Sequence, residues 1–131
     1  NDEIKKLNLK SFKTFNKKIL KEVTKLKYNL SILKKKNRAV IGYGAPARVS
    51  TITNFANIDS NLIDFIIDDS PLKQNRYSPG KHIKILPKKN NINYKIENVV
   101  VFAYEYFEEI KKKFKKIKVF FFKPIPFKEI K

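Results

Sequence analysis

A glycine turn near the first third of the chain has the residue types and spacing to hold a phosphate. Gly42, Gly44 and Ala47 follow a short apolar run in the pattern G-x-G-x-x-A. In the dinucleotide-binding fingerprint, these small residues allow a tight turn and a close approach of a pyrophosphate. Pro46 suits a first helical turn because its missing N–H needs no partner there, and the free amides of a helix start attract anions. A nucleotide ligand and a turn that merely joins a strand to a helix are equally open interpretations.

Other side chains near this turn also have both a ligand-binding and a structural interpretation. Asp68 lies near the roughly 20-residue offset of a ribose-binding carboxylate, but we favour a turn-capping role ahead of the Ser-Pro that follows it. His82 is equally open between a structural and a substrate-binding role, because an imidazole titrating near ~6.5 indicates neither by itself. Lys73 and Arg76 are solvated loop charges on the structural interpretation. Tyr43 is expected to be a neutral lining aromatic, since a phenol titrates near ~10.

Five short apolar runs predict the strands that position these residues. They are AVIGYG (39–44), LIDFIIDD (62–69), HIKIL (82–86), NVVVFAY (98–104) and KVFFF (118–122). Several lack alternation of apolar and polar residues, which is typical of parallel strands covered by helices on both faces. Segments 46–56 and 105–116 predict helices, and 87–94 predicts a polar loop. We therefore expect an α/β, Rossmann-like fold with a mostly parallel sheet of about five strands flanked by helices.

A long amphipathic helix is predicted over residues 11–33, before the first strand. Its apolar residues recur every three or four positions: Phe12, Phe15, Ile19, Val23, Leu26, Leu30 and Leu33. Lysines 34–36 suit the negative end of the helix dipole, and Asn37 can take the left-handed conformation that ends a helix. We divide the chain into this N-terminal helical segment (1–37), leading from an upstream domain, and the sheet domain (38–131). The absence of methionine is consistent with a fragment of a longer protein.

Composition narrows the possible functions. The formal net charge is +18, but only three of the 30 basic residues are arginine, the residue that reads phosphates and bases through two hydrogen bonds. We therefore rank a basic nucleic-acid-binding module last and expect no specific nucleic acid. The apolar runs are too short for a membrane span, so we expect a soluble, cytoplasmic protein. There is no cysteine and one histidine, so no zinc site or other metal site is expected in this chain.

Several ordered blocks together resemble the C-terminal domain of the nucleotide-sugar C-methyltransferases. The blocks are GYGAPARVSTITNF, LIDFIIDDSPLKQNRYSPGKHIKIL, NVVVFAYEYFEEI and VFFFKPIPF, and they cover nearly the whole chain. The family pattern has a GYGAPAK turn, a segment containing KQG, PG and HI, an AWN strand end and a closing PIP. The resemblance implies a carbon methylation of a nucleotide-linked deoxysugar that uses S-adenosylmethionine. S-Adenosylmethionine and zinc are then expected on missing upstream domains of the same chain.

The resemblance implies that residues 38–131 help to hold the nucleotide diphosphate sugar. The candidate substrate-binding residues are Gly42, Tyr43, Gly44, Ala45, Pro46 and Arg48 in the turn, Asp68, Lys73, Gln74, Arg76 and His82 in the second block, and Tyr104 and Glu105 at a strand end. The last two replace the tryptophan and asparagine of the family pattern, which puts binding at that edge in doubt, because a glutamate only accepts hydrogen bonds.

No nucleophile with an adjacent base is evident, so we expect no catalytic residue and no catalysis from this chain by itself. The alternative function is an NAD-binding domain of an oxidoreductase, suggested by Gly42, Gly44, Ala47 and Asp68. For the leading function we expect the glycine turn, Asp68 and Tyr104 to lie along one edge of the sheet, with segment 68–82 facing the turn across a groove.

Overall fold

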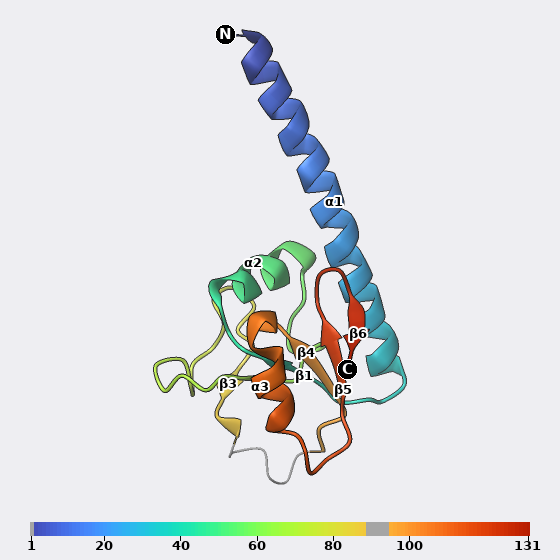
Figure 1. Cartoon of the computed structure of the whole chain (residues 1–131), viewed down its shortest axis with the longest axis vertical. Coiled ribbons are helices and arrows are strands. Elements are labelled where there is room, and N and C mark those ends of the chain that lie inside the picture. Colours follow the sequence, from blue (N-terminus) through green and yellow to red (C-terminus); the bar gives the residue numbers. More distant parts are fainter. Residues whose placement is uncertain (1, 89–94) are drawn as a thin grey trace.

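The structure is a computed structural model that describes residues 2–88 and 95–131, excluding the side chains of residues 2–16 and of Arg48. Most of the loop predicted over 87–94 lies outside this part of the chain. Within it, the elements form a mixed α/β fold with a sheet between helices and a long first helix (Figure 1). None of the helices in the described residues is both long and apolar enough to cross a membrane.

Helix α1 (Asp2–Lys35) begins earlier than the helix predicted over 11–33. Its C-terminal half contacts helix α2 (Ala47–Ala56) and strand β1 (Val40–Tyr43). It buries the predicted stripe residues Val23, Leu26 and Leu30, whereas the side chains of Phe12 and Phe15 lie outside the description. Asn37 has a φ of 56° and its N–H donates to the Lys34 carbonyl at 2.9 Å. The predicted left-handed ending is therefore confirmed.

The sheet has six strands in the order β3-β2-β1-β4-β5-β6. Strands β1 (Val40–Tyr43), β2 (Ile66–Ile67), β3 (Ile85–Leu86), β4 (Asn98–Val101) and β5 (Phe120–Lys123) are parallel to one another, as predicted. The register aligns Gly42 with Ile66 on one side and with Val100 on the other. All five predicted apolar runs therefore contain strands that lie side by side in one sheet.

The expected number of about five strands was too low, because β6 (Lys128–Ile130) adds an antiparallel strand to β5. It pairs Phe121 with Ile130 and Lys123 with Lys128. The three residues of β6 are K-E-I, two of them exposed, so they form no apolar run. Backbone pairing with β5 makes this segment a strand, and apolar periodicity could not reveal it.

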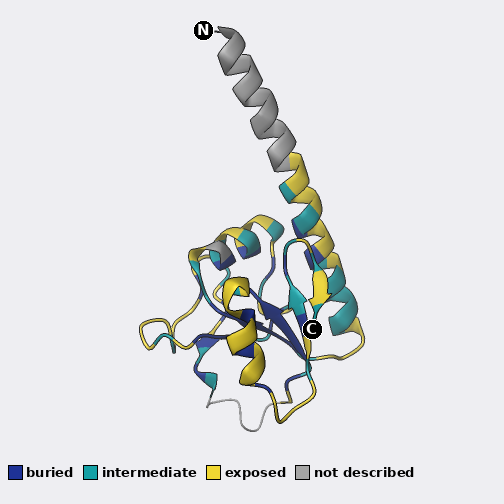
Figure 2. Ribbon diagram, viewed as in Figure 1, coloured by how far each residue is buried: buried dark blue, intermediate teal, exposed yellow. Residues whose placement is uncertain are grey.

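Helices cover both faces of the sheet and the strands lie between them (Figure 2). Along β1, Val40 packs in one buried cluster with Leu26 and Leu30 of α1, and the neighbouring Ile41 packs in a second cluster with Ile110 of helix α3 (Phe107–Lys112). Alternate residues of a strand point to opposite faces, and here both faces are buried. This explains why the strand sequences lack an alternation of apolar and polar residues.

Helix α2 (Ala47–Ala56) follows the glycine turn and matches its predicted range closely. The helix predicted over 105–116 is shorter than expected. It begins as the 3₁₀ turn η2 (Tyr104–Tyr106), continues as α3 (Phe107–Lys112) and then gives way to turns. Acidic residues open α3 and lysines close it, in agreement with the helix dipole.

Candidate functional site

A cavity of about 310 Å³ lies at the C-terminal ends of β1, β2 and β4. From β1 the chain proceeds outward to β2 and β3, and from β4 it proceeds the other way to β5 and β6. Open parallel sheets bind ligands where the strand order reverses in this manner. The cavity is lined by Tyr43, Gly44, Ala45 and Pro46 from the turn, by Asp68, Asp69 and Lys73 after β2, and by Ala103, Glu105, Tyr106, Glu109, Ile110 and Lys113 after β4.

The two glycines of the turn make room for the protein's own residues. Gly44 has a φ of 89°, and a Cβ built there would lie 2.5 Å from the Ala103 Cβ. At Gly42, which does not have a positive φ, a Cβ would lie 2.9 Å from the Phe102 ring. Close packing against Ala103, just after β4, and the positive φ therefore already require a glycine at position 44, whether or not a ligand approaches it.

Asp68 fastens the turn from the neighbouring strand. One carboxylate oxygen accepts the Ala45 N–H at 2.6 Å, and the other accepts the Ser70 N–H at 2.8 Å. The residue is only 8% exposed. The favoured turn-capping role is therefore confirmed, and the carboxylate is oriented toward backbone amides on both sides.

Two further side chains of the second block hold the same turn. The Lys73 ammonium donates to the Ala45 carbonyl at 2.9 Å, while its side chain stays exposed at the cavity. The Gln74 side-chain amide donates to the Asp68 carbonyl at 2.9 Å. Lys73 thus presents a cation at the cavity wall, and Gln74 supports the turn without lining the cavity.

Tyr43, Asp69 and Lys113 form a hydrogen-bonded group in the cavity wall. The Tyr43 hydroxyl donates to one oxygen of Asp69 at 2.8 Å, and the Lys113 ammonium binds the other. Lys113 also lies over the Tyr43 ring, 5.7 Å from its centroid. Burial, reinforced by the Asp69 carboxylate, raises the pKa of Tyr43 above its ordinary value of about 10. Tyr43 therefore remains a neutral hydrogen-bond donor at neutral pH.

Most of the expected 68–82 block does not face the glycine turn, which corrects the predicted groove. The segment around Pro79 lies against the C-terminal half of α2, where Asn54 donates to the Pro79 carbonyl at 3.2 Å and Lys81 donates to Asn57 at 2.5 Å. Arg76 and His82 are exposed and do not line the cavity. His82 has a φ of 54° and donates its backbone N–H to the Ser78 carbonyl, which makes it part of a turn.

The candidate residues Tyr104 and Glu105, which follow β4, lie in different surroundings. Glu105 lines the cavity, whereas Tyr104 stacks on Phe107 with ring centroids 6.5 Å apart. The Lys123 ammonium of β5 lies 4.4 Å from the Tyr104 ring centroid. Tyr104 therefore faces β5, and only Glu105 of this pair reaches the cavity.

Sequence reasoning missed several lining residues, above all Glu109 and Lys113. Both follow Glu105 at intervals of four residues, the spacing that places side chains on one face of a helix. That periodicity could have identified them once Glu105 was a candidate. Asp69 follows the candidate Asp68 directly in the sequence but was not itself a candidate.

The cavity carries more negative than positive charge in a strongly basic chain. Four carboxylates line it, Asp68, Asp69, Glu105 and Glu109, against the two lysines already described. In the described part of the chain, no group of three or more histidine, aspartate or glutamate side chains is arranged to hold a metal ion. The arrangement can accept hydrogen bonds from hydroxyl or amino groups and can offer lysine ammoniums to a phosphate at the rim.

Comparison with protein families matches residues 2–126 to the C-methyltransferase C-terminal domain. Comparison with individually curated proteins gives no match. The family match spans the long helix, the glycine turn, all the cavity-lining segments and β5. The chain therefore belongs to the C-methyltransferase C-terminal domain family.

Proposed function

We propose that this chain helps a C-methyltransferase to hold a nucleotide-linked deoxysugar during S-adenosylmethionine-dependent methylation of a sugar carbon. One observation carries the proposal. Three separate blocks of the sequence on which the resemblance rests contribute to a single cavity, through Gly44, Asp68, Lys73 and Glu105. The strand order is that of Rossmann-like folds, which bind nucleotides at this edge of the sheet.

The start of α2 and Lys73 supply the positive groups that a diphosphate requires. Pro46 is the N-cap of α2 and makes no side-chain capping bond, and the first turn contains no acidic residue. A helix N-terminus carries roughly half a positive charge, which favours phosphate there. Lys73 lies beside this turn. Arg48 is proposed as a substrate-binding residue on the basis of the sequence alone, because its side chain lies outside the described part of the structure.

The size of the cavity indicates that it holds part of the ligand. About 310 Å³ is at the lower end of the roughly 300–1,000 Å³ typical of small-molecule pockets. A nucleotide sugar has a nucleoside, a diphosphate and a sugar ring, so in this proposal the remainder extends toward other parts of the enzyme. The chain contains no cysteine and its one histidine is His82, so its residues do not fit zinc. Zinc, S-adenosylmethionine and the catalytic base belong elsewhere in the methyltransferase in this proposal.

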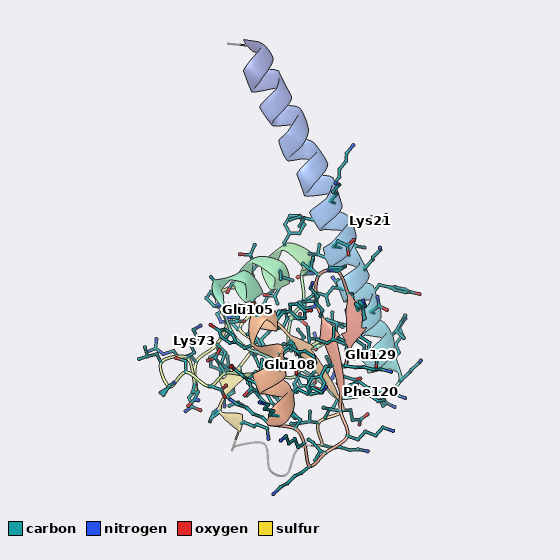
Figure 3. All side chains as sticks on the ribbon, viewed as in Figure 1. Lys21, Lys73, Glu105, Glu108, Phe120 and Glu129 are labelled. Carbon is teal, nitrogen blue, oxygen red and sulfur yellow. The ribbon has the colours of Figure 1, made fainter. Side chains whose placement is uncertain are left out.

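Calorimetric titration of the 131-residue chain with UDP-glucose, TDP-glucose and NAD tests the function. We expect both nucleotide sugars to bind and NAD to bind more weakly. Lys73→Met should weaken nucleotide-sugar binding about fivefold, which corresponds to about 1 kcal/mol. Lys21→Met is the matched control, because Lys21 is an exposed lysine of α1, away from the loop that carries Lys73 (Figure 3).

Two results would contradict the proposal. Preferential binding of NAD would favour an oxidoreductase domain, since NAD shares the diphosphate but carries a nicotinamide riboside where a nucleotide sugar carries the sugar to be methylated. Equal loss of affinity in the Lys73 and Lys21 variants would indicate that only the overall charge of +18 attracts the ligand. Thermal unfolding of each variant separates lost binding from lost folding.

A further inference from the structure

We propose that the edge of the sheet opposite the cavity docks on an anionic membrane surface. In this proposal exposed lysines meet the lipid phosphates, and an apolar turn enters the headgroup layer. The proposal goes beyond the function proposed above, because it concerns a separate surface and another partner. This surface lies at the N-terminal ends of the parallel strands, whereas the cavity lies at their C-terminal ends.

The strand register brings several chain connections to this edge of the sheet. Val40 of β1 pairs with Asn98 of β4, and Asn98 pairs with Phe120 of β5, so these three strands begin side by side. Strand β6 runs the other way, and its Ile130 pairs with Phe121, so β6 ends at the same edge. The connections that lead into β1 and β5 therefore lie at the same edge as the residue that follows β6.

Exposed basic side chains gather in these connections and form a surface that we call the basic edge. Its members are Lys35, Lys36 and Arg38 at and after the end of α1, Lys115, Lys116 and Lys118 between α3 and β5, and Lys131 after β6. Two carboxylates beside this surface already have lysine partners. Asp64 binds Lys34, and Glu97 lies 3.9 Å from Lys95. The basic edge is therefore strongly positive.

Apolar side chains are exposed among these lysines. Ile117 is 47% exposed in the turn before β5, and Phe120 is 38% exposed. The Lys118 ammonium lies 6.0 Å from the centroid of the Phe120 ring. A hollow of about 270 Å³ at Phe120 is also lined by Val119, Phe121, Ile130, Lys111, Glu129 and Lys131. Lysine packs its methylene stem on apolar surface and keeps its ammonium in water, so this mixture suits the boundary between lipid headgroups and acyl chains.

Charge and residue type favour a membrane over other partners. A second copy of the chain would bring the same positive charge to the contact, and like charges repel. Protein interfaces are enriched in arginine and depleted in lysine, and sequence-specific nucleic-acid contacts also favour arginine, whereas the basic edge has one arginine, Arg38. An anionic membrane attracts clustered lysines by charge alone, about fivefold in affinity for each lysine near the surface. Figure 1 shows the turn between α3 and β5 at the opposite end of the molecule from the N-terminus of α1.

Co-sedimentation of the 131-residue chain with vesicles tests the proposal. We expect binding to phosphatidylcholine vesicles in which about one-third of the lipid is phosphatidylglycerol, and no measurable binding to pure phosphatidylcholine. The triple variant Lys115→Gln/Lys116→Gln/Lys118→Gln should bind the anionic vesicles at least about twentyfold more weakly. Lys17→Gln/Lys18→Gln/Lys21→Gln is the matched control and should lose less than about threefold. It removes the same charge from exposed lysines of α1, and Figure 3 shows Lys21 well away from Phe120.

A fluorescent reporter identifies the surface that enters the lipid. The chain contains no tryptophan, so Ile117→Trp places a single indole at the basic edge. Leu20→Trp places one on α1, at a site that is 53% exposed, as the matched control. Anionic vesicles should shift the emission of the Ile117→Trp protein to shorter wavelength, because indole settles at the membrane interface. The emission of the Leu20→Trp protein should stay unchanged.

The remaining outcomes overturn the proposal. Equal losses of affinity in the two triple variants would show that only the net charge of +18 attracts the vesicles. A shift of the Ile117→Trp emission with a single-stranded oligonucleotide, but not with vesicles, would assign the basic edge to nucleic acid. An emission that vesicles leave unchanged would show that this turn does not enter the membrane. The proposed function is tested separately, because none of these variants changes a residue that lines the cavity.

Discussion

Replacing Gly44 with alanine should destabilise the fold before it affects a ligand. The new Cβ would lie 2.5 Å from the Ala103 Cβ and 3.0 Å from the Ala103 nitrogen, at a φ of 89°. The left-handed backbone costs roughly 1–2 kcal/mol for a residue with a Cβ, and overpacking costs about 1–3 kcal/mol. We expect a loss of about 2–5 kcal/mol, a large part of the ~5–15 kcal/mol by which a domain is stable.

Gly80→Ala is a matched control for the backbone effect. Gly80 has a φ of 85°, but the atoms that a Cβ would meet are the side-chain amide atoms of Asn54, the nearest at 2.1 Å. Asn54 is exposed, so its side chain can rotate away, whereas the Ala103 backbone, which follows β4 and donates its N–H to the Tyr43 carbonyl at 3.3 Å, cannot. The two variants also share the stabilisation that alanine gives by restricting the unfolded chain.

Urea unfolding followed by far-UV circular dichroism measures both variants. Gly44→Ala should lower the free energy of unfolding by about 1–3 kcal/mol more than Gly80→Ala, the difference being the overpacking against Ala103. Equal losses, within about 0.5 kcal/mol, would refute the reasoning. Gly44 would then be needed for its backbone conformation and not for its packing against Ala103.

Three further predictions concern polar side chains that hold the strand ends. Because the pKa of Tyr43 is raised in the folded chain, the unfolded chain loses the phenol proton first above about pH 10, and the free energy of unfolding should fall by up to about 1.4 kcal/mol per pH unit. Tyr43→Phe should make the free energy of unfolding depend less steeply on pH in this range. An unchanged slope would contradict the raised pKa. Asp68→Asn should cost about 1–3 kcal/mol in urea unfolding, because an amide cannot accept both backbone N–H groups; a loss below about 0.5 kcal/mol would argue against the turn-capping role. Asp64→Ala should destabilise the fold more than Lys34→Ala. The ion pair between the two side chains is partly exposed and worth at most about 1 kcal/mol, whereas Asp64 also accepts the Val40 N–H at 3.1 Å. Equal losses of stability by thermal unfolding would show that this hydrogen bond to the backbone contributes little.

Local chemistry made much of the fold predictable from the sequence. The apolar runs predicted all five parallel strands because strands buried on both faces need apolar residues at consecutive positions. Asn37 predicted the end of α1 because few residues adopt a positive φ at low cost. Asp68 predicted a capped turn because an aspartate accepts hydrogen bonds from nearby backbone amides. Each of these depends on a residue and its immediate neighbours.

The residues that line the site were only partly predictable, because local patterns do not show which distant segments meet. The glycine turn, Asp68 and Tyr104 were expected at one edge of the sheet. The turn and Asp68 line one cavity there, but Glu105 lines it in place of Tyr104. Lys113 was not expected, because its place there depends on the face that α3 turns to the sheet through Phe107 and Ile110. His82 was expected near the glycine turn, but the loop that carries it lies against the C-terminal half of α2 instead.

The sequence by itself therefore determined the α/β class, the parallel strands, the C-terminal end of α1 and the family resemblance, because these depend on residue types over short stretches. Only the tertiary structure decided that β6 pairs with β5, that Gly44 makes room for Ala103, and that glutamates face Lys73 and the turn across one cavity. These features join segments that are distant in the sequence. Their geometry follows from strand order, register and helix orientation, which no local pattern of residues specifies.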